Sequence, residues 1–392
     1  MDAAIDATAG QFELNEDQRA IQEMAEAFAA DRVAPHALEW DKARHFPADV
    51  IKETGPLGFG GIYVREDVGG SALGRLDAVL IFEALAKACP AFSSFISIHN
   101  MAASMIDRFG SDEQRRRFLP KLTAMEQLAS YCLTEPGSGS DAAALKTRAV
   151  RSGGNGSDYV VNGAKQFISG AGDSDVYVTM VRTGQDGPKG ISTLVIGKDA
   201  PGLSFGANET KMGWHMQSTR TVNFQDCAVL EENRLSEEGA GFGIAMAGLD
   251  GGRLNIAACS LGGAQAALDK ALAYTAERKA FGQTINQFQA LQFRLADMET
   301  ELQAARVFLY TAAAKLDRKA PDASKWSAMA KRFVTDTGFK VANDALQLLG
   351  GYGYLHDYGV EKLVRDLRVH QILEGTNEIM RVIVARHLVR RE

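Results

Sequence analysis

The chain has 392 residues, of which 46% are hydrophobic and 23% charged, so it is long enough for two or three domains and a large core. Its 43 Lys and Arg residues against 49 Asp and Glu residues give a net charge of -6, which repels phosphate backbones and disfavours a nucleic-acid partner. No uninterrupted apolar run reaches the roughly 18 to 20 residues that a membrane span needs, so no membrane partner is expected.

The N-terminus and the cysteines indicate a compartment. The first residues are acidic and lack the basic or Arg-rich features of a signal or transit peptide. The four cysteines are widely spaced and form no CxxC pair. We therefore expect reduced thiols in the cytoplasm of a bacterium, or in the mitochondrial matrix if the chain is a processed eukaryotic form.

The first part of the chain, up to residue 129, has a helical pattern. Asn15 and Gln18 have the spacing of a capping box and predict a helix that ends or kinks near Pro35. Further helices are predicted at residues 76–87, 101–109 and 113–122.

Residues 130–238 have a β pattern. The Asn162-Gly163 pair within residues 159–167 predicts two strands joined by a tight turn. Other strands are predicted at residues 176–182, 191–196 and 221–224, separated by Gly, Pro and Asp.

Residues 239–392 return to helices, with apolar residues every three or four positions between Leu291 and Leu316. Helices, then a β unit, then long helices predict an α+β protein with separate domains at residues 1–129, 130–238 and 239–392. A doubly wound parallel sheet is disfavoured.

The common catalytic signatures are missing from the sequence. It has no GxGxxG, GxxxxGK[ST], GxSxG or HExxH segment, and its seven histidines never fall at metal-ligand spacing. No metal site is therefore expected, and any cofactor must be held in another way.

Three clusters of small and polar residues remain. CLTEPGSGSD at residues 132–141 offers backbone N–H and hydroxyl donors for an anion or a polar ring edge, although its composition also suits an interdomain linker. QLLGGYGY at residues 347–354 follows a long helix and could be an ordinary glycine cap. LEGTNE at residues 373–378 sets a carboxylate among apolar neighbours.

Together these clusters, with RKAFG at residues 278–282, resemble the signatures of the acyl-CoA dehydrogenase family in the order that the family has them. The resemblance extends from about Leu14 to Arg390 and makes a simple linker at 132–141 untenable. It implies an N-terminal helical domain, a central β-barrel and a C-terminal four-helix bundle.

The resemblance also implies a bound FAD and the residues that hold it, partly from a neighbouring subunit. These residues are Leu133, Thr134, Gly139, Ser140, Phe167, Ser169, Arg278, Phe281, Phe288, Gln289, Gln347, Gly350, Gly351, Thr376 and Glu378. Many relatives have Trp where this chain has Phe167, which puts only the local ring contact in doubt. Contacts to substrate and CoA are implied for Ser140, Asp250, Arg253 and Arg386, although Arg253 could equally form a salt bridge within the bundle.

The implied reaction is α,β-desaturation of an acyl-CoA, with Glu374 as the base that removes the α-proton and flavin N5 as the hydride acceptor. Some relatives carry the base at the position of Gly252 instead. Glycine has no carboxylate, so Gly252 favours Glu374 over a buried ion-pair role for that residue.

Several stretches, among them residues 97–101, 167–172, 188–192 and 368–375, resemble the branch of the family that oxidises isobutyryl-CoA to methacrylyl-CoA in valine catabolism. Overlap with 2-methylbutyryl-CoA or butyryl-CoA is expected, because one methylene in an apolar pocket is worth only about 1 to 3 kcal/mol. The family also implies electron-transfer flavoprotein as acceptor and a homotetramer. It includes flavin-containing, DNA-associated alkylation-response proteins, which the acidic charge of this chain disfavours.

Overall fold

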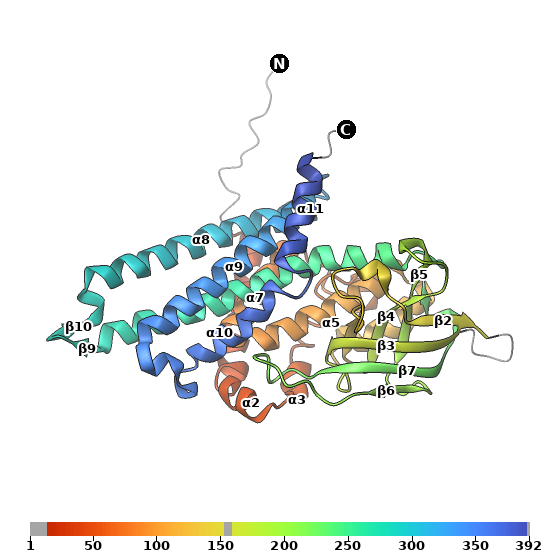
Figure 1. Cartoon of the computed structure of the whole chain (residues 1–392), viewed down its shortest axis with the longest axis horizontal. Helices are drawn as coiled ribbons and strands as arrows, with labels where there is room; N and C mark the ends of the chain where they lie inside the picture. Colours follow the sequence, from red (N-terminus) through yellow and green to blue (C-terminus); the bar gives the residue numbers. More distant parts are fainter. Residues whose placement is uncertain (1–13, 153–158, 390–392) are drawn as a thin grey trace, which may run out of the picture.

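The computed structural model describes residues 14–152 and 159–389. In this part of the chain N-terminal helices precede a β domain, and long helices follow it, which confirms the predicted α+β architecture. Figure 1 shows the β domain at one end of an elongated molecule and the far ends of the long helices at the other. Every helix within the described ranges is too short or too polar to cross a membrane.

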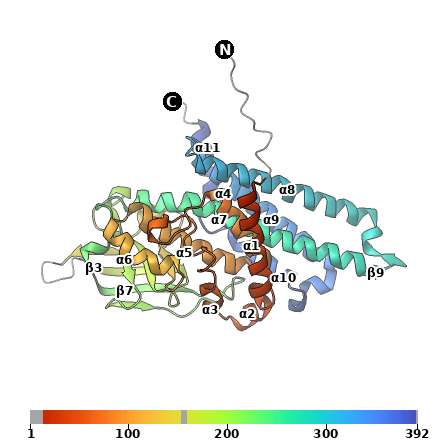
Figure 2. The ribbon, with the colours of Figure 1, turned by 180° about the vertical axis from the view of Figure 1, so that it is seen from behind.

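The N-terminal helices begin with the predicted capping box. The Asn15 side chain accepts a hydrogen bond from the Gln18 backbone N–H at 2.8 Å, and Gln18 Oε1 accepts one from the Asn15 N–H at 3.2 Å. A π-helical turn, η2 (Ala29–Val33), continues the first helix almost to Pro35. The helices are α1 (Glu16–Phe28), α2 (Ala37–Ala43), α3 (Ala48–Lys52), α4 (Arg75–Ala88), α5 (Pro90–Phe109) and α6 (Asp112–Thr123). α1 lies across the outside of α4 (Figure 2).

The β domain is one sheet with the strand order β6-β7-β3-β2-β4-β5-β8, and β1 pairs in parallel with β4. Its strands are β1 (Ala129–Cys132), β2 (Arg148–Arg151), β3 (Tyr159–Ser169), β4 (Val176–Arg182), β5 (Ile191–Gly197), β6 (Leu203–Phe205), β7 (Thr219–Val229) and β8 (Arg234–Leu235). In the described ranges β6 and β8 do not pair with each other, so the sheet is an open path and not the closed barrel that the resemblance implies.

The predicted hairpin at Asn162-Gly163 is wrong. β3 runs through this pair as one strand, and the ladder to β7 shifts register between Val161 and Gly163, which marks a β-bulge. Gly163 has φ +141°, and a Cβ there would lie 2.7 Å from Thr147 Cα, so only glycine fits. The same preference for glycine that predicts a tight turn thus serves a bulge in the β3–β7 ladder, close to Thr147.

The C-terminal helices follow directly from β8. They are α7 (Gly241–Glu277), α8 (Gln289–Asp317), α9 (Ala323–Leu349), α10 (Val360–Arg368) and α11 (Asn377–Val389), with a small hairpin of β9 (Lys279–Ala280) and β10 (Gln283–Thr284) between α7 and α8. α7, α8 and α9 pack on one another and α10 packs on α7 and α9, as expected of a four-helix bundle. Short 3₁₀ turns are η3 (Glu66–Val68), η4 (Ala142–Ala144), η5 (Pro188–Gly190), η6 (Glu231–Asn233), η7 (Ile285–Gln287), η8 (Gly350–Tyr354), η9 (His356–Tyr358) and η10 (Val369–Gln371).

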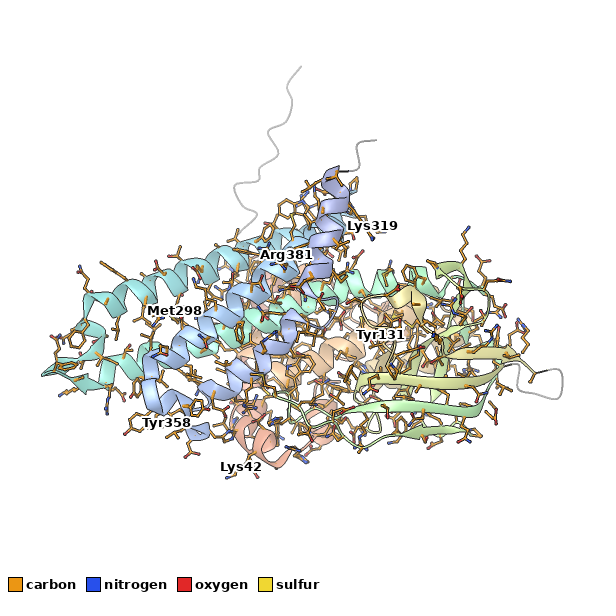
Figure 3. The ribbon with its side chains drawn as sticks, viewed as in Figure 1. Lys42, Tyr131, Met298, Lys319, Tyr358 and Arg381 are labelled. Atoms are coloured by element: carbon orange, nitrogen blue, oxygen red, sulfur yellow. The ribbon has the colours of Figure 1, made fainter. Side chains whose placement is uncertain are left out.

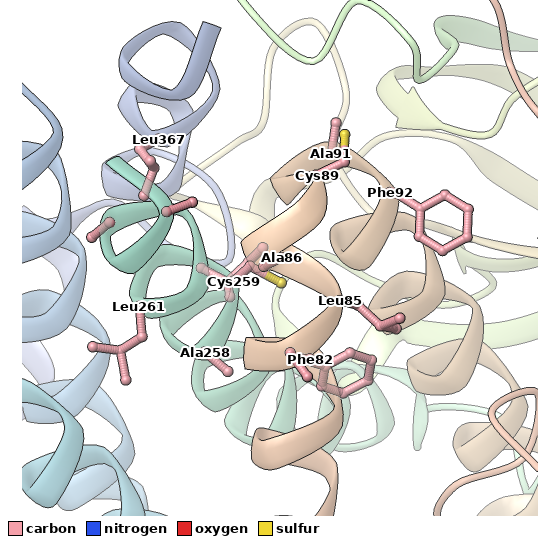
Figure 4. Close-up of a cluster of buried hydrophobic side chains, with 14 of the residues drawn as sticks. Phe82, Leu85, Ala86, Cys89, Ala91, Phe92, Ala258, Cys259, Leu261 and Leu367 are labelled. Carbon is pink, nitrogen blue, oxygen red and sulfur yellow. The ribbon is translucent and has the colours of Figure 1, made fainter. Parts of the chain in front are cut away.

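Small side chains let α4 and α7 approach closely. A Cβ at Gly262 of α7 would lie 2.1 Å from the Glu83 carbonyl oxygen and 2.8 Å from Ala86 Cβ, both on α4. Figure 4 shows Ala86 and Cys259 among the buried side chains of these two helices. All four cysteines are buried and none forms a disulfide, as the sequence predicts.

A second buried cluster joins the β domain to the helices. It contains Met101 and Met105 of α5, Ile244 of α7, Leu133 after β1 and Val178 of β4. Because this cluster is continuous across both parts, the β domain is held rigidly against α5 and α7.

His99 of α5 also connects the N-terminal helices to the first strand of the β domain. It is fully buried; its Nε2 donates to the carbonyls of Gly60 (3.1 Å) and Leu122 (3.0 Å), and its Nδ1 accepts from the Ala129 N–H at 3.0 Å. Burial lowers the pKa of His99 to about 4, against the opposing effect of the two carbonyls. Only the neutral ring satisfies all three partners.

We expect this histidine to make the fold sensitive to acid. The unfolded chain binds a proton below about pH 6.5 and the folded chain does not, so stability falls as the pH drops from 6.5 towards 4, by about 2 kcal/mol at pH 5. Between pH 7 and pH 5, His99→Gln should therefore lose about 2 kcal/mol less unfolding free energy than the wild type, measured by urea titration. Equal losses for the two proteins would contradict this role.

Candidate active site

A sharp turn between η10 and α11 carries the candidate base. Glu374 and Gly375 both have left-handed backbone conformations, with φ +56° and +89°. The Thr376 hydroxyl accepts a hydrogen bond from the Ile379 N–H at 3.3 Å and so caps α11. A non-glycine residue held at positive φ is strained, and such strain is concentrated at functional sites.

The turn leaves the Glu374 carboxylate shielded from water. The residue as a whole is partly exposed, but Oε2 is buried and accepts no hydrogen bond from the described residues. Burial raises the pKa of Glu374 to about 7, although the cations Arg253 and Lys331 oppose this rise. A carboxylate with a pKa near neutrality is suited to general base catalysis.

Gly252 on α7 lies directly against this carboxylate. A Cβ at position 252 would be 2.6 Å from Glu374 Oε2, 2.9 Å from its Cδ and 3.1 Å from Met101 Sδ. The alternative base position of the family therefore not only lacks a carboxylate but leaves the space that the Glu374 carboxylate occupies.

Two further polar atoms beside Glu374 have no partner in the described residues. They are the Tyr131 hydroxyl on β1 and Nε of Arg253 on α7. Burial raises the pKa of Tyr131, and the charge of Glu374 adds to this effect. Figure 3 places Tyr131 where the β domain meets the helices. Unpaired buried polar atoms are costly, so their grouping around a strained carboxylate indicates a site for a bound molecule.

The loop after β1 is fixed by buried contacts of Glu135, whereas the space beside its glycines is empty. Glu135 forms a buried ion pair with Lys165 at 2.8 Å and accepts backbone hydrogen bonds from residues 146 and 147. A Cβ at Gly137 or Gly139 would meet nothing within 4 Å. The open face can therefore receive a ligand with backbone and hydroxyl donors.

This loop meets the end of β3. The Gln166 N–H donates to the Thr134 carbonyl at 2.8 Å, which places Leu133 and Thr134 close to the segment with Phe167 and Ser169. Phe167 has φ +58°, and the residue is 64% exposed. A strained backbone that presents an aromatic ring to solvent offers a flat apolar surface for another ring.

The other predicted cofactor residues lie elsewhere. The β9–β10 hairpin is at the far tip of the long helices, away from the β domain (Figure 1). Arg278, Gln347, Gly350 and Gly351 line a cavity of about 390 Å³ there. Phe281 is 96% exposed beside Phe288, and Gln289 begins α8. The structure thus separates the predicted cofactor residues of one chain into two groups.

The predicted substrate residues are also divided. Asp250 forms an ion pair with the buried Arg253, as the alternative role for Arg253 requires. Ser140 is exposed on the open loop. Arg386 is exposed in the last turn of α11, and nothing in the described residues brings it to Glu374. Glu378 is also exposed and pairs with Arg381 at 3.4 Å.

Sequence reasoning missed Tyr131, Met101 and Lys331. The signal for Lys331 was present, because it shares a helical face with Ser327 and Val334, which are fully buried. A lysine on a core-facing stripe must be paired or functional.

The structure also brings together a set of side chains that could ligate a metal. Oxygen and nitrogen atoms of Asp41, His356 and Glu361 lie within 4.8 Å of one another. Arg365 already donates to Asp41 at 2.7 Å and to Glu361 at 2.9 Å. A guanidinium among these groups supplies the positive charge that a metal ion would bring.

Replacement of Gly252 by Ala should displace the Glu374 carboxylate, because the new methyl group would overlap Oε2. We expect the acyl-CoA oxidation implied by the resemblance to fall at least about tenfold, while circular dichroism and the thermal midpoint change little. Gly243→Ala is the matched control on α7, since its Cβ would meet nothing within 4 Å. Full activity in Gly252→Ala would show that the carboxylate does not need this space.

Comparisons with known proteins identify the family of this chain. Models of the N-terminal, middle and C-terminal domains of acyl-CoA dehydrogenases match residues 15–126, 130–227 and 239–389. The chain is 57% identical over 376 residues to isobutyryl-CoA dehydrogenase, mitochondrial, of Dictyostelium discoideum, with 96% of this chain and 90% of that protein covered.

Solved structures are similar over the whole length. Butyryl-CoA dehydrogenase from Megasphaera elsdenii gives a TM-score of 0.93 at 36% identity, covering 97% of this chain and 100% of that one. A chain from a structure described as electron transferring flavoprotein of Acidaminococcus fermentans gives 0.94 at 41% identity, with 97% and 100% covered. From its domain matches and its full-length relatives, the chain belongs to the acyl-CoA dehydrogenase family.

Proposed function

We propose that this chain oxidises isobutyryl-CoA to methacrylyl-CoA in valine catabolism. As a member of its family it is a flavin-dependent oxidoreductase. The observation that carries the proposal is the Glu374 carboxylate, which is buried, packed against Gly252 and has a pKa of about 7. The identity of 57% to a relative named isobutyryl-CoA dehydrogenase supports the choice of acyl chain.

Glu374 removes the α-proton of the thioester. This proton is only weakly acidic, so the negative charge that develops on the thioester oxygen needs a hydrogen-bond donor. The Glu374 backbone N–H has no acceptor in the described residues and is free to donate to that oxygen. The chemistry that FAD supplies when bound is acceptance of the β-hydrogen as a hydride.

The residues of the loop after β1 and of the end of β3 fit a flavin. Leu133, Thr134 and Ser169 offer backbone and hydroxyl groups to its polar edge, and Phe167 offers a ring face. Gly139 and Ser140 on the open loop would approach its phosphates, and Thr376 and Glu378 would complete this side. Asp250, Arg253, Ser140 and Arg386 are proposed to contact substrate or CoA.

The second group of residues would serve the FAD of another copy. Arg278, Phe281, Phe288, Gln289, Gln347, Gly350 and Gly351 form this group. Their separation from the base and the 96% exposure of the apolar Phe281 support a partner subunit at this tip, within a homotetramer. We further propose electron-transfer flavoprotein as the acceptor, which the Acidaminococcus fermentans neighbour supports.

Isobutyryl-CoA should give the fastest turnover among isobutyryl-, 2-methylbutyryl-, isovaleryl- and butyryl-CoA in a dye-linked assay of the purified protein with its flavin bound. Glu374→Gln should retain its flavin but lose at least about a thousandfold in kcat, because the amide cannot accept the proton. A faster reaction with butyryl-CoA would leave the mechanism in place and correct the acyl chain. Retained activity in Glu374→Gln would move the base elsewhere.

The pH dependence follows from the raised pKa of Glu374. Only the carboxylate form accepts a proton, so kcat/KM should fall about tenfold for each pH unit below about 7 and level off above it. The measurement is dye-linked turnover from pH 5 to 9 with stable flavin absorbance as a control. An activity that stays constant down to pH 5 would exclude a base with this pKa.

A further inference from the structure

We infer that Lys331 on α9 is a positioning residue for the base, which holds the Glu374 turn in place and sets the charge that faces its carboxylate. This inference rests on the proposed function, because it takes Glu374 as the base. It concerns a residue outside the predicted cofactor and substrate contacts.

Lys331 is fully buried, and its ammonium group donates hydrogen bonds to the turn that carries Glu374. Its Nζ donates to the Gly375 carbonyl at 2.8 Å and to Asn377 Oδ1 at 2.9 Å. Gly375 is the second left-handed residue of the turn, and Asn377 is the first residue of α11. The ammonium therefore bridges the two sides of the point where the chain turns from Glu374 into the helix.

Two further side chains of α9 hold both flanks of the turn. Asp336 Oδ1 accepts hydrogen bonds from Gln371 Nε2 at 2.8 Å and from Asn377 Nδ2 at 2.7 Å. Thr335 Oγ1 accepts a second bond from Asn377 at 3.0 Å. The turn is thus clamped to α9 at its start and end by Asp336 and within it by Lys331.

Each element that surrounds Glu374 carries a charged or titratable side chain near it. From α7, Arg253 is already paired with Asp250. From β1, Tyr131 is neutral because burial raises its pKa. From η10, burial lowers the pKa of His370 to about 3, and its Nδ1 bonds to Ser260 on α7.

The remaining charges are on α9 and α11. Asp336 and Glu378 raise the pKa of Lys331 less than Glu374 does, and Glu378 is exposed. Within the described ranges Lys331 bonds to no carboxylate, and Glu374 is the negative charge that acts on it most strongly. Burial lowers the pKa of Lys331 to about 7, and Glu374 opposes this effect. Each group therefore favours the charged form of the other.

A purely structural role does not explain this residue. A buried ammonium without a carboxylate in contact is costly, and a methionine of similar length would fill the space without that penalty. The penalty is understandable if the hydrogen bonds keep a strained turn in one conformation and the charge keeps the base ionised.

The test compares Lys331→Met and Lys331→Gln with the wild-type flavoprotein. Lys331→Met should reduce kcat at least about tenfold with a smaller change in KM, and should move the acidic limb of the pH profile up by about one pH unit. Lys331→Gln keeps a donor for the turn but no charge, so it should show the shifted limb with a smaller loss of kcat. Lys340→Met is the control, because Lys340 is exposed on the opposite side of α9, where it pairs with Glu301.

A second measurement isolates proton transfer. Acetyl-CoA has α-hydrogens but no β-carbon, so its exchange of hydrogen for deuterium in heavy water reports the base without oxidation. Exchange should fall in Lys331→Met in parallel with kcat and stay unchanged in Lys340→Met. Unchanged exchange and an unshifted pH limb in Lys331→Met would overturn the inference.

Two further outcomes distinguish failure of this inference from an unfolded variant and from failure of the proposed function. If Lys331→Met loses its flavin or its fold, Asp336→Ala decides, because Asp336 is partly exposed and clamps the same turn; wild-type exchange in that variant would overturn the inference. If the wild type neither oxidises any of the four acyl-CoA substrates nor exchanges acetyl-CoA, the proposed function itself fails.

Discussion

The contact between Gly252 and the Glu374 carboxylate constrains the rest of the site. It fixes how closely the turn before α11 can approach α7, since any side chain at position 252 would overlap the carboxylate. Met101 of α5 reaches the same point, so three elements distant in sequence meet around one carboxylate. The buried cluster that joins α5 and α7 to the β domain then determines where Tyr131 and the open loop lie relative to the base.

Local patterns in the sequence were sufficient for much of this fold. The capping box at Asn15, the strand Val176–Arg182 and the long α8 were predicted correctly, because each depends on neighbours within a few residues. Asn162-Gly163 was predicted wrongly because its local signal is the same for a turn and for a bulge, and only the packing against Thr147 distinguishes them. Whether the sheet closes into a barrel depends on strands far apart in sequence, so local patterns could not decide it, and the barrel was expected from the resemblance alone.

The candidate site, like the fold, could be predicted from the sequence only in part. The Glu374 motif could be recognised from its residue types, whereas Lys331 could not be connected with it, since 43 positions separate the two along the sequence. Their proximity depends on how α9 packs against the turn before α11. The ion pair between Asp250 and Arg253, by contrast, is one helical turn apart and was among the alternatives that the sequence allowed.

α9 connects the two halves of the proposed cofactor arrangement. Lys331 clamps the base in the first third of this helix, and Gln347 lines the distal cavity sixteen residues later, about 24 Å along a straight helix. A displacement of α9 would therefore move the base turn of one active site together with the surface offered to a neighbouring one. Because Asp336 and Lys331 tie the turn to a helix and not to a loop, assembly of the proposed tetramer and the position of the base would depend on the same rigid element.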